Sequence, residues 1–302
     1  MRRIHADLLL LLTALIWGLA FVFQKTAMAH IGPLTFLCVR SVIAALALAP
    51  LALREGRQSG GGLVPGRLWP IAIVAGTLFF LGGALQQIGL VTATVTNTGF
   101  LTGLYVVLVP LIGLALFREH VTRIIWLAVA LAFVGTWLLG GGTLAGFTHG
   151  DWLVAAGAIF WASHLHAVKR SGHHARPVAF TFAQFVVIAL FAGAGAISFE
   201  HIDAARLWAA RGELAYVGLL SSALTFTLLA VAMRHTSAAE GTIIVSLETL
   251  FAAFAAALLL GERLPAIGWV GAALMFSASL VVQVAGARAE HAARKMANAG
   301  TT

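Results

Sequence analysis

Apolar stretches of about 20 residues recur along the whole chain, separated by short polar segments. A helix needs about 20 mostly apolar residues to cross the hydrocarbon core of a bilayer. We therefore predict an all-α, polytopic membrane protein with ten transmembrane helices at 7–27, 33–53, 68–90, 96–117, 122–140, 151–168, 177–198, 213–232, 238–260 and 265–285. The polar residues from Arg288 onward predict a short cytoplasmic tail.

The composition excludes a water-soluble enzyme. Only 10% of the residues are charged and 60% are hydrophobic, whereas soluble proteins carry about 25% charged residues. The single cysteine, Cys38, cannot form an intramolecular disulfide.

The positions of the basic residues explain the net charge of +8. With the N-terminus inside, 14 of the 19 Lys and Arg residues fall in loops on that side, four fall in loops on the other side, and Arg40 lies within a span. Lys and Arg accumulate in cytoplasmic loops. We therefore predict cytoplasmic termini, which require an even number of spans, and a lipid bilayer rather than nucleic acid as the partner.

The second half of the chain repeats residues of the first half at an almost constant offset. At an offset of 144, the recurring pairs are His5 and His149, Asp7 and Asp151, Trp17 and Trp161, and Lys25 and Lys169. At an offset of 143, the pairs are Glu119 and Glu262, and Trp126 and Trp269. Such matches are rarer by chance than matches of Leu or Ala, so we predict two five-helix repeats, 1–143 and 144–302.

An odd number of spans in each repeat means that the second repeat enters the membrane from the opposite side. The charges agree, because Lys25 falls outside and Lys169 falls inside. Inverted repeats are the architecture of many secondary transporters, in which the two halves open a central site to one side at a time. The alternative is a duplication that only stabilises a helical bundle.

Three motifs in these repeats resemble those of a transporter family. The first is Trp17-Gly18 in the first span, with Trp161 at the matching position of the second half. The other two are FREH at 117–120 and LGER at 260–263, each of which contains the Glu that closes the fourth span of its half. The chain resembles the EamA branch of the drug/metabolite transporter superfamily and, within it, the YddG-type bacterial exporters of aromatic amino acids. The resemblance implies export of small organic solutes, above all aromatic or other apolar amino acids, by alternating access across the bacterial inner (plasma) membrane.

Polar residues within the spans are candidates for substrate binding, because they are costly in hydrocarbon. Glu248 lies mid-span, and its repeat mate is Tyr105. The carboxylate of Glu248 could receive a substrate ammonium group or carry a proton. It could equally pair with Arg40 or bond to a neighbouring helix. Arg40 itself could hold an anion, extend its charge toward water or pair with an acid.

Two amide side chains add to these candidates. Gln86 adjoins Gln87, and adjacent helix positions face about 100° apart, so at most one of the two is expected to line a cavity well. Asn97 lies among the threonines that begin the fourth span, and a helix N-terminus there would suit a carboxylate. Hydrogen bonding between helices is the alternative role of these amides.

Aromatic residues form the third group of candidates. Trp17 and Trp161 lie about ten residues into their spans, away from the interfaces where Trp is common. With Phe79, they could form the wall of a pocket for a bulky apolar substrate. The alternative role is core packing.

No motif calls for a cofactor, a metal or a catalytic reaction. His164 and His166 have no third ligand at metal spacing, and neither a Walker A sequence nor HExxH is present. We therefore expect no enzyme, no cofactor and a small-molecule substrate such as an amino acid, carried by a chain that can act as a monomer. The alternatives are a channel-like facilitator and an intramembrane enzyme.

Overall fold

The computed structural model describes residues 3–59, 61–144, 146–264 and 266–299, with side chains up to Arg288. Within these ranges the chain forms helices and loops and no strand. The helices are α1 (Arg3–Ala27), α2 (Pro33–Gln58), α3 (Trp69–Leu90), α4 (Val95–Thr102), α5 (Tyr105–Phe117), α6 (Arg123–Leu139), α7 (His149–Ser171), α8 (Pro177–Phe199), α9 (Ala204–Ala209), α10 (Arg211–Ala215), α11 (Thr225–Ala232), α12 (Ala238–Val245), α13 (Glu248–Leu259) and α14 (Ala266–Ala299). A π-helical segment, Tyr216–Leu224, joins α10 to α11.

Each predicted span coincides with one helix or with consecutive helices, to within a few residues at most ends. In the described part of the chain, eight helical segments are long and apolar enough to cross a membrane. The remaining two of the ten predicted spans correspond to α6 and α7. Helix α6 is apolar but has only 17 residues. Helix α7 is more polar, because it contains three histidines, Asp151, Lys169 and Arg170. The described residues thus form helices and no strand, and their apolar helices are consistent with the predicted polytopic membrane protein, whereas the count of ten crossings stays a prediction. The residues predicted as a tail continue α14 to Ala299.

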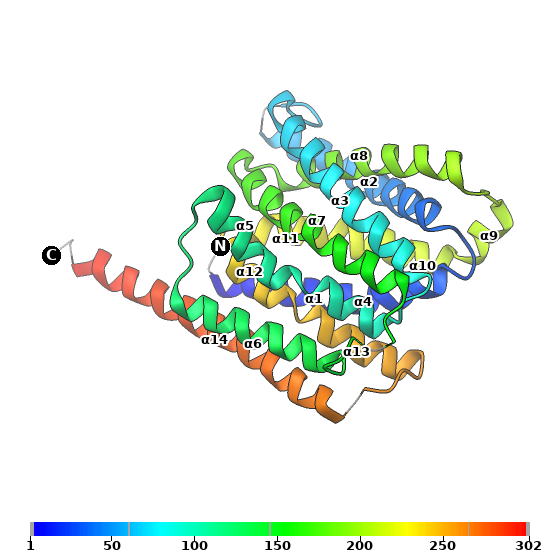
Figure 1. The fold of residues 1–302 in the computed structure, drawn as a ribbon. Coiled ribbons are helices and arrows are strands. Elements are labelled where there is room, and N and C mark those ends of the chain that lie inside the picture. The colour runs from blue at the N-terminus through cyan, green and yellow to red at the C-terminus, as the bar shows by residue number, and fades with distance from the viewer. Residues whose placement is uncertain (1–2, 60, 145, 265, 300–302) are drawn as a thin grey trace.

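Helix α1 runs through the bundle between helices of both halves of the chain (Figure 1). It packs against α13 and α11. On one side of it α3 lies along α7 and α2 along α8, and on the other side α14 lies along α6. Residues from the two halves are therefore neighbours throughout the bundle, so a cavity in it is lined by both.

Helices α6 and α14 cross with their backbones in contact. A Cβ atom on Gly135 of α6 would lie 2.7 Å from the Gly271 carbonyl oxygen and 2.9 Å from the Met275 nitrogen of α14. Small residues allow this close approach in membranes, where van der Waals packing rather than the hydrophobic effect drives helix association. Gly89 of α3 and Gly150 of α7 make a second backbone contact of this kind.

Two membrane-length segments are interrupted within the bundle. The interruptions lie at 103–104, between α4 and α5, and at 246–247, between α12 and α13. These positions correspond at the offset of 143. Thr249 Oγ1 donates a hydrogen bond to the Gly99 carbonyl oxygen, 3.1 Å away, and so joins the two interrupted segments. Broken helices at the bundle centre frame the binding sites of many transporters.

Large apolar side chains cover the outside of the bundle. Leu258 and Phe199 are each 84% exposed, and Ile197 is 78% exposed. Large exposed apolar side chains in this number suit lipid rather than water. The buried positions that pack helix on helix are largely small or apolar, with alanine prominent among them.

Candidate functional site

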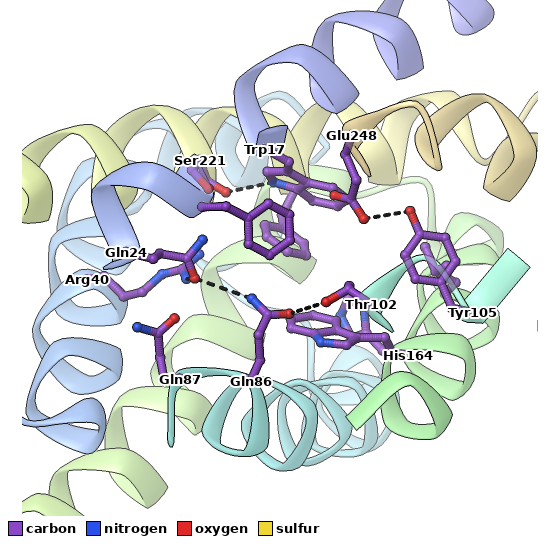
Figure 2. A pocket seen from close by; sticks show the side chains of 15 residues that line it. Trp17, Gln24, Arg40, Gln86, Gln87, Thr102, Tyr105, His164, Ser221 and Glu248 are labelled. Atoms are coloured by element: carbon purple, nitrogen blue, oxygen red, sulfur yellow. Dashed lines mark hydrogen bonds between the residues drawn. The ribbon is translucent and has the colours of Figure 1, made fainter. Parts of the chain in front are cut away.

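A cavity inside the bundle is lined by side chains from both halves of the chain (Figure 2). The lining residues are Trp17, Phe21, Gln24, Arg40, Gly83, Gln86, Gln87, Thr102, Tyr105, Trp161, His164, Leu165, Ser221, Phe226 and Glu248. Five of the seven residues predicted from the sequence are among them, namely Trp17, Gln86, Tyr105, Trp161 and Glu248.

Glu248 is the acidic group of the cavity. It lies on the first turn of α13, directly after the interruption, and is only 3% exposed. Its Oε1 accepts a hydrogen bond of 2.7 Å from the hydroxyl of Tyr105, the first residue of α5. Glu248 and Tyr105, which correspond in the two repeats, are therefore in direct contact. Of the alternatives open from the sequence, Glu248 bonds to a neighbouring helix and not to Arg40.

Trp17 forms one aromatic wall of the cavity. Its indole Nε1 donates to Thr225 Oγ1 at 2.7 Å and to the Ser221 carbonyl oxygen at 3.0 Å. Its ring lies 4.7 Å from that of Phe226, centroid to centroid. Ser221 belongs to the π-helical segment, a rare geometry that is frequent at functional sites. Residues of the second half of the chain thus fix the orientation of Trp17, which belongs to the first half.

Trp161 forms a second aromatic wall. Its indole Nε1 is buried without a hydrogen-bond partner in the described part of the chain. Phe79 packs edge-on against Trp161, with 4.9 Å between ring centroids, and is fully buried. Phe79 is therefore absent from the lining and supports Trp161 from behind.

A polar corner, which we define as Gln24, Arg40, Gln86 and Gln87, forms another part of the lining (Figure 2). Gln86 Oε1 accepts from Thr102 Oγ1 at 3.2 Å, and Gln87 Nε2 lies 3.5 Å from the Met28 sulfur. Both glutamines line the cavity, contrary to the expectation that at most one would, because two long side chains can bridge the angle between adjacent helix positions.

Asn97 lies outside the cavity. It belongs to the first turn of α4, where its backbone nitrogen donates to the Thr94 side chain at 3.1 Å. The last residue of α4, Thr102, lines the cavity, whereas Asn97 lies at the opposite end of this helix. The sequence made Asn97 a candidate because a helix N-terminus would suit a carboxylate, but the cavity lies at the C-terminal end of α4.

Lys25 and Lys169, which correspond at an offset of 144, each bind main-chain carbonyl groups beyond the end of another helix. The acceptors of Lys25 Nζ are Leu90 at 2.8 Å, Val91 at 3.1 Å and Ala93 at 2.9 Å, and those of Lys169 Nζ are Met233 at 2.7 Å and Thr236. A cation suits the C-terminal end of a helix, where carbonyl groups lack partners. We call the two ends of the bundle the Lys25 end and the Lys169 end.

The repeat-related glutamates behave differently at these two ends. At the Lys25 end, the Glu262 carboxylate accepts from the backbone nitrogens of Val95 and Thr96, at 2.9 and 3.0 Å, and so caps α4. At the Lys169 end, α12 is capped by its own Ser237 and Glu240 instead. Glu119 lies 3.8 Å from His166 Nδ1.

The histidines near the cavity have protein partners. His164 Nε2 lies 3.0 Å from Gln184 Oε1, and His166 Nε2 lies 2.9 Å from the Val109 carbonyl oxygen. Among the residues that the structure describes, no group of three or more His, Cys, Asp or Glu side chains could hold a metal ion.

Comparison with known proteins places this arrangement in a family. The sequence model of the EamA-like transporter family matches residues 4–141 and 148–284. An uncharacterized transporter of Archaeoglobus fulgidus is 31% identical over 292 residues, covering 94% of this chain and 87% of its own. The uncharacterized transporter YwfM of Bacillus subtilis is 24% identical, covering 92% of this chain and 94% of its own.

One solved crystal structure has the same fold, with a TM-score of 0.74 at 16% identity, over 96% of this chain and 100% of its own. The two matches of the family model together span most of the sequence, and the relatives cover nearly all of it. This chain belongs to the EamA-like transporter family.

Proposed function

We propose that this chain is a secondary transporter that exports amino acids with aromatic or other apolar side chains from the cytoplasm by alternating access. The cavity carries the proposal. It combines the aromatic walls Trp17 and Trp161 with two charged residues, Arg40 and Glu248, on separate sides (Figure 2). A solute with an aromatic body and charged groups fits such a lining, since stacking favours the body and buried charges favour the polar groups.

A counterflow experiment tests this function. We expect purified protein in liposomes loaded with unlabelled L-phenylalanine to accumulate the labelled amino acid transiently, with saturable kinetics. A carrier exchanges solute across its own conformational cycle, so a channel-like facilitator would show flux without counterflow. An intramembrane enzyme would convert the solute. Absence of counterflow for a panel of apolar and aromatic amino acids would refute the proposal.

The proposed topology has ten spans in two inverted five-helix repeats, 1–143 and 144–302, with both termini in the cytoplasm of a bacterial inner membrane. Two observations support the repeats, and a third, at the two ends of the bundle, supports their inversion. The family model matches twice, at starting residues 144 apart. The interruptions at 103–104 and 246–247 correspond. The lysines at the ends of α1 and α7 bind equivalent carbonyl groups.

The proposed cycle uses the difference between the two ends of the bundle. Glu262 ties the segment after α13 to the start of α4, and we propose that this contact holds the Lys25 end closed. We propose that Glu119 caps the start of α12 in the opposite state, when the Lys169 end closes. A carboxylate at a helix N-terminus contributes about 0.3–1 kcal/mol, and up to about 2 kcal/mol where it is partly buried. Exchange of one cap for the other would keep the two states close in energy.

Replacement of Glu262 by Gln should favour opening of the Lys25 end, because it removes the charged cap of α4. In a C38S background, we expect a cysteine introduced at Thr102 in the cavity to react about two- to tenfold faster with a membrane-impermeant maleimide applied to whole cells. The reaction rate is followed by the mass shift of the protein.

Two variants control this labelling experiment. Glu119→Gln leaves α4 capped and should not raise the rate. A cysteine at the exposed His201, beyond the end of α8, reports whether that side of the membrane faces the reagent. An unchanged rate in E262Q, with position 201 labelled, would contradict the proposed cap exchange.

A further inference from the structure

Arg40 is a buried cation without an acidic partner. It lies on α2, lines the cavity and is only 5% exposed. Its neighbours include the rings of Phe36 and Phe79, whose centroids lie 6.0 and 5.7 Å from the guanidinium carbon. No carboxylate oxygen lies within 4.0 Å of it in the described ranges. A buried guanidinium keeps its charge, so it needs compensation from some other group.

The protein satisfies only part of the hydrogen-bonding capacity of Arg40. Its Nε donates to Ser222 Oγ at 3.0 Å, and its Nη1 donates to Gln24 Oε1 at 3.5 Å. Both acceptors are neutral. A guanidinium has five N–H donors arranged in a planar fork, so most of them are left for a ligand in the cavity that Arg40 lines.

The amides next to Arg40 increase the number of free donors. Gln24 Oε1 accepts from Gln86 Nε2 at 3.4 Å as well as from Arg40. The carbonyl side of the Gln24 amide is thereby occupied, and its amino group has no hydrogen-bond partner in the part of the chain that the structure describes. The polar corner therefore presents a charge and neutral N–H groups, whereas Gln87 Oε1, an acceptor without a hydrogen-bond partner in the described residues, is itself buried.

We infer that Arg40 binds the carboxylate of the transported solute, with Gln24 assisting, and that this contact selects carboxylate-bearing cargo. A carboxylate has two oxygens in a plane, which match the planar fork of a guanidinium in geometry and in charge. One unpaired cation balances one negative charge, so a monocarboxylate fits better than a more highly charged anion. This inference rests on the proposed transport function and specifies which part of the solute Arg40 recognises.

A matched pair of solutes tests the inference on the wild-type protein. 3-Phenylpropionate and 3-phenylpropionamide share an aromatic body, but only the first carries a carboxylate. We expect the acid to inhibit L-phenylalanine counterflow with an apparent affinity roughly ten- to a hundredfold higher than the amide, because hydrogen bonds to charged groups are the stronger ones. Equal inhibition by the two compounds would overturn the inference.

Variants at Arg40 test whether this residue causes the preference for the acid over the amide. In Arg40→Gln the difference between acid and amide should disappear, whereas Arg40→Lys should keep part of it, since a point charge replaces the planar fork. Arg57→Gln is the matched control, because Arg57 is exposed near the end of the same helix. A preference for the acid that persists in a folded R40Q protein would assign the carboxylate to another residue.

Binding measurements separate this inference from the transport function. Titration calorimetry of the same acid and amide with the purified chain in detergent tests Arg40 without any flux. Absence of counterflow with intact acid selectivity would refute only the transport proposal. Counterflow with no acid selectivity would refute only the role of Arg40. If R40Q does not fold, the comparison of acid and amide on the wild-type protein still shows whether the cavity prefers a carboxylate.

Discussion

Glu248→Gln is expected to reduce L-phenylalanine counterflow by roughly tenfold or more, because it removes the charge that faces a substrate ammonium group. The substitution keeps the size of the side chain and its ability to accept the 2.7 Å hydrogen bond from Tyr105. Membrane expression and thermal unfolding should therefore change little. Counterflow at the wild-type rate would exclude a contact between the Glu248 carboxylate and the substrate.

Tyr105→Phe is the comparison variant for this prediction. It removes the hydrogen bond but leaves the carboxylate in place, so the loss should be smaller, about two- to tenfold. Export measured with and without a pH gradient separates the two roles of Glu248. A substrate contact predicts that E248Q loses transport under both conditions, whereas a proton carrier predicts loss of the gradient-driven component alone.

The second large effect is expected at the crossing of α6 and α14. Gly135→Leu places a side chain against the backbone of α14, where even a Cβ atom would lie 2.7 Å from the Gly271 carbonyl oxygen. Overpacking costs about 1–3 kcal/mol where side chains can adjust, and here the obstacle is backbone. We expect a clear drop in the thermal unfolding temperature in detergent and less monodisperse protein.

Gly212→Ala is the control for the glycine prediction. Gly212 lies in α10, and a Cβ atom there would meet no other atom within 4 Å. Alanine should raise the stability by up to about 1 kcal/mol, because it is the better helix former. Equal effects of the two substitutions would show that the α6–α14 contact does not hold the bundle together.

The helices were predictable because membrane thickness imposes a length on them. Apolar runs and polar breaks such as the loop before Trp69 placed most helix ends within a few residues. The interruptions at 103–104 and 246–247 were not predicted, since the apolar residues on both sides of each indicate one continuous span. They coincide with contacts between distant segments, such as that of Thr249 with Gly99. The π-helical segment has no pattern of its own in the sequence.

The candidate site was predictable where the repeat helped. Glu248 and Tyr105 are repeat mates, and their contact follows from the symmetry of two halves around a shared cavity. For the polar corner, the repeat did not indicate which residues would meet. Gln24 was not singled out, and Arg40 had several possible roles, because its partner Ser222 is 182 positions away along the chain. Asn97 is not among the lining residues, because the cavity is lined by the opposite end of α4, at Thr102.

In the proposed ten-span topology, lipid beside α6 has to adapt to a short helix. Its 17 residues rise about 26 Å, a few ångströms less than the roughly 30 Å of hydrocarbon in an average bilayer. Leu127 on this helix is 52% exposed, so acyl chains would contact it directly in that topology. Such hydrophobic mismatch is relieved by local thinning of the bilayer. Vesicles made from shorter acyl chains should therefore surround this flank with less elastic strain than thick, sterol-rich membranes.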